Sequence, residues 1–226
     1  MIIELKTKYT LNKMKKKLAI IGTKEFSEQI RFYAEKTGKF EFVGYFDDLE
    51  EKGTMIQGSP VLGKVEESID LYHQGLFDCI FIGIGYTRFD LREYYYKKLK
   101  GEVPFANIIM PRVTLDEKIQ LGEGIYIGED TFICPNCMID DNVFIHGGCV
   151  IAHDNKIGKH SYLAGRIDTA GFCEIGERNF VGVRVIFADH VKTCQDVWIG
   201  LACVVAKSIN EPGKYMSPAA KLYKIE

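Results

Sequence analysis

A six-residue repeat runs without an insertion from Val113 to Val205 and constrains the fold of the second half of the chain. Every sixth residue is large and apolar, apart from two threonines, and Gly or Ala often follows it. The position two residues earlier is mostly small or β-branched. The repeating large positions are Leu115, Leu121, Ile127, Ile133, Ile139, Ile145, Ile151, Ile157, Leu163, Thr169, Ile175, Val181, Phe187, Thr193, Ile199 and Val205.

This period excludes one class of structure and favours another. An α-helix completes a turn about every 3.6 residues, so a period of six would scatter the large residues around its surface. A β-solenoid accommodates the period because each hexad supplies one short strand and one corner, and three hexads close a three-sided coil. Stacked coils bury the large residues in one continuous column, and small corner residues let the backbone turn tightly. We therefore predict a three-sided solenoid of parallel β-strands.

Composition narrows the classes of function. The chain has 226 residues, 46% of them hydrophobic, which suffices for one large or two modest packed domains. A formal net charge of −2 argues against electrostatic binding to nucleic acid or to an anionic membrane. No apolar stretch approaches the roughly 20 residues that a membrane span requires. Residues 1–14 are expected to form a flexible leader.

The seven cysteines are interpreted as reduced thiols. Four of them occupy the small inward position of the repeat, where a thiol packs as a small hydrophobic group. This usage predicts a cytoplasmic protein. Cys134 and Cys137 have CxxC spacing, but they fall in different positions of an unbroken repeat, and a structural zinc site would need a second pair of ligands. We therefore predict that the protein uses no metal.

The first half of the chain alternates strand and helix patterns. Short apolar runs at residues 17–21, 41–46 and 79–84 predict strands. Helical spacing of apolar residues is present at 26–36 and 89–98. Such alternation is typical of a small open α/β sheet with parallel strands.

Four candidate binding residues follow these strands directly, namely Gly22, Asp47, Asp48 and Gly85. Ligands of open α/β sheets bind beyond the carboxyl ends of the strands, so these positions point to a ligand site. A dinucleotide site is not favoured, because a pyrophosphate cradle requires successive glycines and Gly22 stands alone in its loop. The paired acids either bind a base or ribose or form a solvated turn, and the residues alone leave both readings open.

Motifs in both halves resemble those of one family. The first half carries Phe46-Asp47-Asp48 and an Ile-Gly-Ile-Gly segment at 82–85. Within the repeats, residues 149–158 read Cys-Val-Ile-Ala-His-Asp-Asn-Lys-Ile-Gly, and residues 217–221 read Ser-Pro-Ala-Ala-Lys. On these motifs the chain beyond about Lys16 resembles the PglD/NeuD-type sugar acyltransferases.

The resemblance implies a fold, an assembly and an activity. It implies a small Rossmann-like α/β domain over residues 1–108 and a left-handed parallel β-helix with a C-terminal tail over residues 109–226. The chain would form a homotrimer with active sites in the grooves between subunits. It would be an acetyl-CoA-dependent N-acetyltransferase that acts on the amino group of a nucleotide-linked dideoxyamino sugar, in bacterial surface glycan or lipopolysaccharide biosynthesis. Neither nucleic acid nor a membrane would be a partner.

The resemblance also implies roles for individual residues. His153 and Asp154 would form the catalytic pair, and the Gly171 N–H would stabilise an oxyanion. The nucleotide-sugar would contact Gly22, Asp47, Asp48 and Gly85. Acetyl-CoA would contact Tyr162, Val183, Leu201, Pro218 and Lys221.

The chain departs from the family pattern in three places, one of which is Tyr162, where the family often has a His. Lys24, Glu25 and Phe26 stand where the first loop of the family is usually glycine-rich and includes a His, which leaves the nucleotide and sugar contacts open. Arg166 and Asp168 occupy positions that are commonly small or apolar.

Chemical reasoning from the residues also selects His153. It lies two residues beyond Ile151, at an expected corner of the coil, so its side chain should point outward. An amine must lose a proton as it attacks a thioester, and a neutral imidazole is suited to accept that proton near pH 7. The adjacent Asp154 would orient the imidazole tautomer if the two side chains face each other, which consecutive residues need not do.

Three alternatives remain. The same base and oxyanion donor would serve O-acetylation of a sialic-acid-like sugar. A non-catalytic trimer that binds a nucleotide-sugar is a second alternative, favoured by the altered loop after Gly22. A zinc hydrase of the gamma carbonic anhydrase type is a third, but the spacing of His146, His153 and His190 does not reproduce its ligand set.

Overall fold

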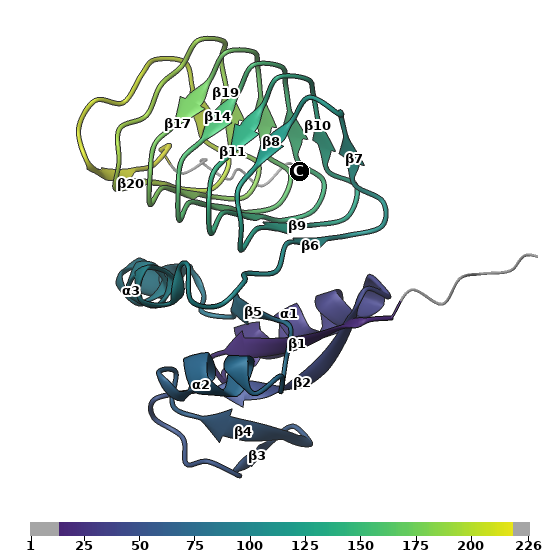
Figure 1. Ribbon diagram of the computed structural model, residues 1–226. Helices are drawn as coiled ribbons and strands as arrows, with labels where there is room; N and C mark the ends of the chain where they lie inside the picture. Colours follow the sequence, from purple (N-terminus) through teal and green to yellow (C-terminus); the bar gives the residue numbers. More distant parts are fainter. Residues whose placement is uncertain (1–13, 219–226) are drawn as a thin grey trace, which may run out of the picture.

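The computed structural model describes residues 14–218, which form two stacked parts (Figure 1). A small α/β domain lies below a three-sided β-helix in this view. Strand β6 (Ile108–Ile109) carries the chain from one part into the other, because it already pairs with β9 of the β-helix. The predicted fold class is confirmed: a Rossmann-like α/β domain precedes a left-handed parallel β-helix.

The small domain is built on a five-stranded sheet in the order β3-β4-β2-β1-β5. The pairs β1–β2, β1–β5 and β2–β4 are parallel, and only β3 runs antiparallel, in a hairpin with β4. The central strand is fully buried over its last four residues, as expected when helices cover both faces of a sheet. The strands are β1 (Lys16–Ile21), β2 (Phe40–Phe46), β3 (Met55–Ile56), β4 (Ser59–Gly63) and β5 (Cys79–Ile82).

The helices of this domain are α1 (Glu25–Lys36), α2 (Glu67–His73) and α3 (Phe89–Leu99), with a short 3-10 helix η1 (Tyr86–Arg88) before α3. The three predicted strands and two predicted helices are therefore confirmed. The β3–β4 hairpin and α2 were not predicted. The hairpin turns at Gln57 and Gly58, which both have positive φ, and two-residue strands carry too little periodicity to be recognised from sequence.

The β-helix consists of three parallel sheets, one on each side of the coil. The six-stranded sheet contains β7 (Thr114–Leu115), β10 (Phe132–Ile133), β13 (Val150–Ile151), β16 (Asp168–Thr169), β19 (Ile186–Phe187) and β21 (Val204–Val205). The four-stranded sheet contains β8 (Gln120–Leu121), β11 (Met138–Ile139), β14 (Lys156–Ile157) and β17 (Glu174–Ile175). The seven-stranded sheet contains β6, β9 (Tyr126–Ile127), β12 (Phe144–Ile145), β15 (Tyr162–Leu163), β18 (Phe180–Val181), β20 (Val197–Ile199) and β22 (Gly213–Tyr215).

The strand register confirms the predicted three-hexad coil. Ile133 pairs with Ile151, and Ile139 pairs with Ile157, an offset of 18 residues in both cases. The large apolar position of each hexad points inward, and Ile139, Ile145 and Ile157 are all 0% exposed. Each buried isoleucine of this column contributes roughly 1.5–3 kcal/mol of transfer free energy to the stability of the coil.

The corners contain a backbone feature that the repeat did not predict. Twelve non-glycine residues, each three positions after a large inward residue, adopt the left-handed conformation with φ between 53° and 62°. They are Asp130, Asn136, Asn142, Asp154, His160, Arg166, Phe172, Arg178, Arg184, His190, Asp196 and Ala202. Asn, Asp and His tolerate this conformation better than other L-residues, which accounts for seven of the twelve.

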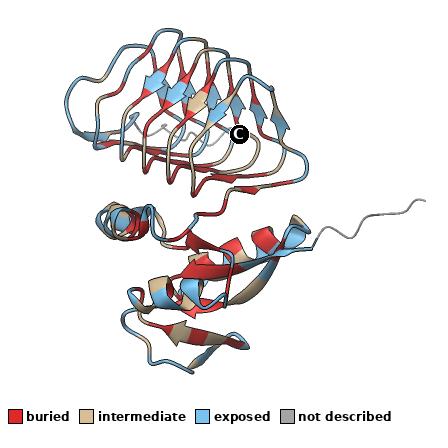
Figure 2. Ribbon diagram, in the orientation of Figure 1, coloured by how far each residue is buried: buried red, intermediate tan, exposed pale blue. Residues whose placement is uncertain are grey.

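The two parts are joined by a layer of aromatic side chains. Successive strands of the seven-stranded sheet present a ladder of rings outward: Tyr126, Phe144, Tyr162, Phe180 and Trp198. Phe144 and Tyr162 stack with ring centroids 4.8 Å apart and planes 5° from parallel. Phe26 of the small domain packs on Phe144, with ring centroids 5.0 Å apart. These strands are accordingly buried on both faces, and Figure 2 shows them in red along the side of the β-helix that faces the small domain.

Arg92 of α3 links the two parts with hydrogen bonds. Its guanidinium donates to the Ile84 carbonyl at 2.7 Å and to the carbonyl and side-chain oxygen of Asn142, both at 2.9 Å. The side chain is fully buried, and within residues 14–218 it forms no ion pair with a carboxylate. Burial lowers the pKa of Arg92 to about 10, so the guanidinium stays protonated at neutral pH.

None of the helices in residues 14–218 combines the length and the apolarity that a bilayer crossing requires.

Candidate active site

His153 lies at the corner between β13 and β14, where the chain passes from the six-stranded to the four-stranded sheet. Its side chain is 54% exposed, so it points outward as predicted. The Nδ1 atom lies 2.8 Å from Oδ2 of Asp154, which confirms that these consecutive side chains face each other. Because a carboxylate can only accept, Nδ1 carries the proton, and Nε2 keeps the lone pair that a base requires.

Gly171 lies beside His153, one coil further on, and a larger residue there would displace the imidazole from its position. A Cβ atom at Gly171 would lie 2.7 Å from Cε1 and 2.9 Å from Nε2 of His153. Among the described residues, no acceptor is bonded to the Gly171 N–H. A free backbone donor next to Nε2 is what an oxyanion site needs, and this role stays a prediction for Gly171.

Asn155 organises this corner and was not recognised from the sequence as a functional residue. It is 2% exposed and donates to the carbonyls of Ala152 at 2.6 Å and Ala170 at 2.9 Å. Its side-chain oxygen accepts from the Cys173 N–H at 2.8 Å. The two carbonyls immediately precede His153 and Gly171, so one amide aligns both coils of the site. The sequence did carry one signal for this role, since Asn155 is a polar residue in an inward position of the repeat that is otherwise mostly apolar or small.

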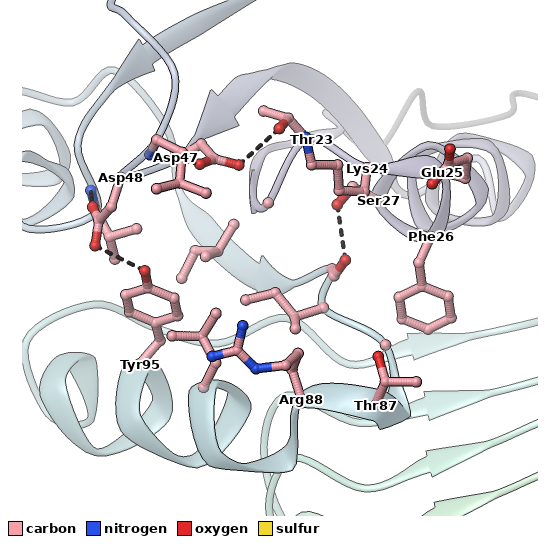
Figure 3. Close-up of a pocket in the computed structure, with 18 residues that line it drawn as sticks. Thr23, Lys24, Glu25, Phe26, Ser27, Asp47, Asp48, Thr87, Arg88 and Tyr95 are labelled. Carbon is pink, nitrogen blue, oxygen red and sulfur yellow. Dashed lines mark hydrogen bonds between the residues drawn. The ribbon is translucent and has the colours of Figure 1, made fainter.

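A second site, a cavity of about 350 Å³, opens at the carboxyl ends of the parallel strands in the small domain (Figure 3). All four predicted binding residues of this domain line it: Gly22, Asp47, Asp48 and Gly85. The structure thus brings together residues that lie up to 63 positions apart in the chain. Arg88, across the cavity from Asp47, and Thr23 also line it and were not predicted.

The two aspartates are held by hydrogen bonds within the domain. Asp47 accepts from the Thr23 hydroxyl at 2.7 Å and from the Leu49 N–H at 2.9 Å. Asp48 accepts from the Val65 N–H and from the Tyr95 hydroxyl, both at 2.8 Å. Burial, followed by the hydrogen bond to Asp48, raises the pKa of Tyr95 above its usual range, so the phenol stays protonated. The carboxylates are therefore fixed in place and shape the cavity wall.

The loop after Gly22 has a structural role that explains its composition. Phe26 points away from Asp47 and packs against the aromatic ladder of the β-helix (Figure 3). Ser27 donates to the Gly83 carbonyl at 2.8 Å and ties the loop to the end of β5. Lys24 and Glu25 are exposed at the cavity rim. Packing between the domains thus accounts for Phe26.

The predicted coenzyme residues do not all lie on one surface. Val183 is 47% exposed and Leu201 is 74% exposed, one coil apart at the same corner. Pro218 is exposed, and Lys221 lies outside the described residues. Tyr162 is 5% exposed because its ring is packed into the aromatic layer between the domains, which argues against the acetyl-CoA contact predicted for it.

Two further histidines are shielded from solvent, His160 buried and His146 partly buried. His146 Nε2 lies 2.6 Å from the Tyr162 hydroxyl, and His160 Nδ1 accepts from the Asn142 side-chain amide at 2.9 Å. Burial lowers the pKa of each to about 4, so both imidazoles are neutral at pH 7. His190 is exposed, with its side chain 3.9 Å from Asp189. Neither His146 nor His160 is available as a surface base.

The cysteines of the described residues are all free thiols. Cys137 is 0% exposed, and its thiol lies 3.0 Å from the Ala152 carbonyl. Burial raises the pKa of Cys149 to about 11 and that of Cys79 to about 12. Within residues 14–218, no three His, Cys, Asp or Glu side chains are grouped as a metal site would require. These thiols are packing residues of the core.

Two family models match consecutive parts of the chain. The model described as the PglD N-terminal domain matches residues 17–99, and the model described as the GMPPB C-terminal domain matches residues 109–216. The boundary between the two matches lies next to β6, where the chain enters the β-helix.

Solved structures share the whole arrangement. GDP-perosamine N-acetyltransferase from Caulobacter crescentus, solved as a histidine mutant with CoA and GDP-perosamine, has a TM-score of 0.80 and 24% identity, and the similarity covers 92% of this chain and 97% of that chain. The acetyltransferase domain of PglB from Neisseria gonorrhoeae has a TM-score of 0.77 and 19% identity, covers 92% and 100% of the two chains, and was also solved with acetyl coenzyme A. At these identities the similarity establishes the fold.

Curated relatives match a smaller region. UDP-3-O-acylglucosamine N-acyltransferase from Bordetella avium is 36% identical over 101 residues, which are 43% of this chain. The chain spans only 28% of that relative and 19% of the corresponding protein from Delftia acidovorans. The two matched domains, their order and their common fold confirm the predicted resemblance to the PglD/PerB-type hexapeptide-repeat acyltransferases.

Proposed function

We propose that this chain is an acetyl-CoA-dependent N-acetyltransferase that acts on the amino group of a nucleotide-linked amino sugar. The observation that carries the proposal is the His153–Asp154 pair on an exposed corner, with Gly171 beside the free Nε2 atom. A general base and a free backbone donor at one point are the two groups that aminolysis of a thioester requires. The similar structures named with CoA and GDP-perosamine support both substrates.

The proposed reaction proceeds through one tetrahedral intermediate. The substrate amine attacks the thioester carbonyl carbon and loses a proton to Nε2 of His153, while Asp154 stabilises the imidazolium that forms. The carbonyl oxygen becomes an oxyanion that accepts a hydrogen bond from the Gly171 N–H. Collapse breaks the C–S bond, and His153 returns its proton to the departing thiolate. The products are an amide and free coenzyme A.

The nucleotide is proposed to bind in the cavity of the small domain. That cavity lies at the carboxyl ends of parallel strands, the usual ligand position of open α/β sheets, and its volume of about 350 Å³ suits part of a nucleotide-sugar. Asp47 and Asp48 would face the base or ribose, and Gly22 and Gly85 would let the ligand approach the backbone. Coenzyme A is proposed to run along the exposed corner at Val183 and Leu201, and Pro218 and Lys221 are proposed as further contacts.

A homotrimer is proposed because one chain keeps the two sites apart. The small domain covers the seven-stranded sheet, whereas His153 lies at the opposite corner, between the six- and four-stranded sheets. A sugar held by one chain would therefore meet the His153 of a neighbour. Four of the six outward residues on the six-stranded sheet are exposed hydrophobics, which supports association through that sheet: Phe132, Val150, Ile186 and Val204.

A cytoplasmic role in bacterial surface glycan biosynthesis is proposed for this activity. The free, buried thiols of the core support a reducing compartment. The nucleotide-sugar of the similar Caulobacter structure supports a glycan precursor as substrate.

The His153→Ala variant tests the proposal. We expect kcat to fall at least about a hundredfold with an unchanged affinity for acetyl-CoA, because the imidazole acts only after both substrates are bound. Acetyl transfer from acetyl-CoA to a panel of nucleotide-linked amino sugars would be measured by release of the free thiol. His73→Ala, which removes an exposed histidine of α2 in the small domain, is the control and should retain activity. Full activity in His153→Ala would remove the proposed base.

A further inference from the structure

Phe172, the residue after Gly171, occupies a corner position that does not suit it. Its φ is 59°, in the left-handed region. The other eleven non-glycine residues of the β-helix with this conformation are Asn, Asp, His, Arg or Ala. A phenyl ring offers no local hydrogen bond to stabilise the conformation, and at 45% exposure it gains little from burial within the chain. A disfavoured residue at a candidate active site is a reason to look for a functional contact.

The contacts of the Phe172 ring are with two imidazoles. The ring centroid lies 5.1 Å from that of His153, with the planes at 88° to each other. On its other side the ring stacks on His190, with centroids 4.8 Å apart and planes 3° from parallel. The phenyl ring therefore stands between the proposed base and a second, exposed imidazole.

The imidazole of His153 needs such a support. Its side chain is 54% exposed, and the χ2 torsion about the Cβ–Cγ bond is broad for histidine. The orientation of the ring therefore depends on a few contacts. Asp154 holds Nδ1, and Gly171 lies against the Nε2 side. Phe172 closes the remaining side with an edge-to-face contact, a class of interaction that changes a side-chain population roughly two- to tenfold.

We propose that Phe172 is a positioning residue that holds His153 in its working orientation. Its ring prevents the imidazole from turning away, so that Nδ1 keeps its carboxylate partner and Nε2 stays next to the Gly171 N–H. The proposal rests on the function of His153 as the base. Stacking on His190 keeps the phenyl ring itself in place.

The Phe172→Asn variant tests this role, because Asn suits a left-handed corner and the fold should not suffer. We expect kcat to fall about five- to tenfold, the KM for acetyl-CoA to stay within about twofold, and the unfolding midpoint to stay equal or rise. Phe172→Tyr keeps the ring and should retain kcat within about twofold. Asp196→Asn, an exchange at a left-handed position on another corner, is the matched control.

A second measurement does not depend on activity. Imidazole ¹⁵N NMR reports the tautomer of His153, whose signals are assigned by their loss in His153→Gln. We expect the population with Nδ1–H to fall in Phe172→Asn and to be restored in Phe172→Tyr. An unchanged kcat and tautomer in Phe172→Asn would overturn the proposal, as would a loss of activity that accompanies dissociation of the assembly. If the wild-type protein transfers no acetyl group, the proposed function fails, while the tautomer measurement still decides the role of Phe172.

Discussion

At the scale of single residues, burial decides which histidine can act as a base. His153 is exposed and paired with a carboxylate, whereas His146 and His160 lie in the layer between the domains. His160 accepts a hydrogen bond from Asn142, whose side-chain oxygen is bonded to the Arg92 guanidinium. Protonation of His160 would break the first bond and place a second cation near Arg92. Desolvation, the largest cause of its lowered pKa, and this neighbouring charge both favour the neutral imidazole.

This arrangement predicts acid sensitivity. The pKa of His160 is about 4 in the folded chain and about 6.5 when unfolded, so the unfolded state binds more protons between these values. Stability is therefore complete above about pH 6.5 and is lost as the pH falls toward 4. We expect His160 alone to lower the free energy of unfolding by about 2 kcal/mol between pH 7 and pH 5.

Urea unfolding of wild type and His160→Gln at one protein concentration measures this, with His190→Gln as the control. An equal pH dependence in wild type and His160→Gln would contradict the prediction.

At the scale of elements, the corner around His153 depends on a buried amide rather than on the apolar column. Two backbone carbonyls and one N–H of adjacent coils are bonded to the Asn155 side chain. An apolar residue in the same inward position would leave the Cys173 N–H unpaired and would leave the two carbonyls with only thiol donors, from Cys137 and Cys173. Each unpaired buried group costs about 1–3 kcal/mol, so the amide makes a large contribution at this corner.

Replacement of Asn155 by Ala should affect both stability and catalysis. We expect the free energy of unfolding to fall by about 2–4 kcal/mol, because one buried N–H loses its partner and two carbonyls lose their amide donor. We also expect kcat to fall about tenfold, because the coils that carry His153 and Gly171 lose their common support. Asn179 occupies the same inward position four hexads later. Its side chain donates a hydrogen bond to the Thr193 hydroxyl and accepts one from the Val197 N–H, and neither partner is next to the proposed base. The Asn179→Ala variant should lose comparable stability with a smaller effect on kcat, and equal effects on kcat would refute the local role of Asn155.

At the scale of the whole molecule, the docking of the two domains separates the nucleotide cavity from the base. The aromatic ladder and Arg92 fix the small domain against the seven-stranded sheet. His153 lies on the opposite corner, between the six-stranded and four-stranded sheets. One chain thus holds the two halves of the proposed site on different sides of the β-helix.

Subunit mixing tests whether neighbouring chains complete the site. Gly85→Trp would fill the cavity of one chain type, because Gly85 lines the cavity with ordinary φ and the nearest atom to an added Cβ is 3.9 Å away. His153→Ala would remove the base from the other type. A homotrimer of either variant alone should be inactive. Hybrids refolded from an equal mixture should recover on the order of a quarter of the wild-type activity, because that fraction of interfaces combines an intact cavity with an intact base. No recovery would place both groups of the site in one chain.

The repeat predicted most of the second domain because its signal is local and redundant. Each hexad independently places a large residue inward, so single exceptions such as Thr169 and Thr193 do not obscure the pattern. His153 and Asp154 were predicted as the catalytic pair because they are consecutive and lie within the motif at residues 149–158, and that role stays a prediction. The roles of Asn155, Phe172 and Arg92 were not recognised, because each depends on partners one coil away or in the other domain.

The sequence by itself determined the coil, its period and the candidate base. These depend only on which residues follow one another, and at what spacing, along the chain. The sequence could not determine what covers each face of the coil. That was decided by the tertiary structure, in which the small domain buries Tyr162, partly buries His146 and leaves the His153 corner open. The physical reason is that accessibility, desolvation and hydrogen-bond partners are set by groups that meet only when the two domains pack together.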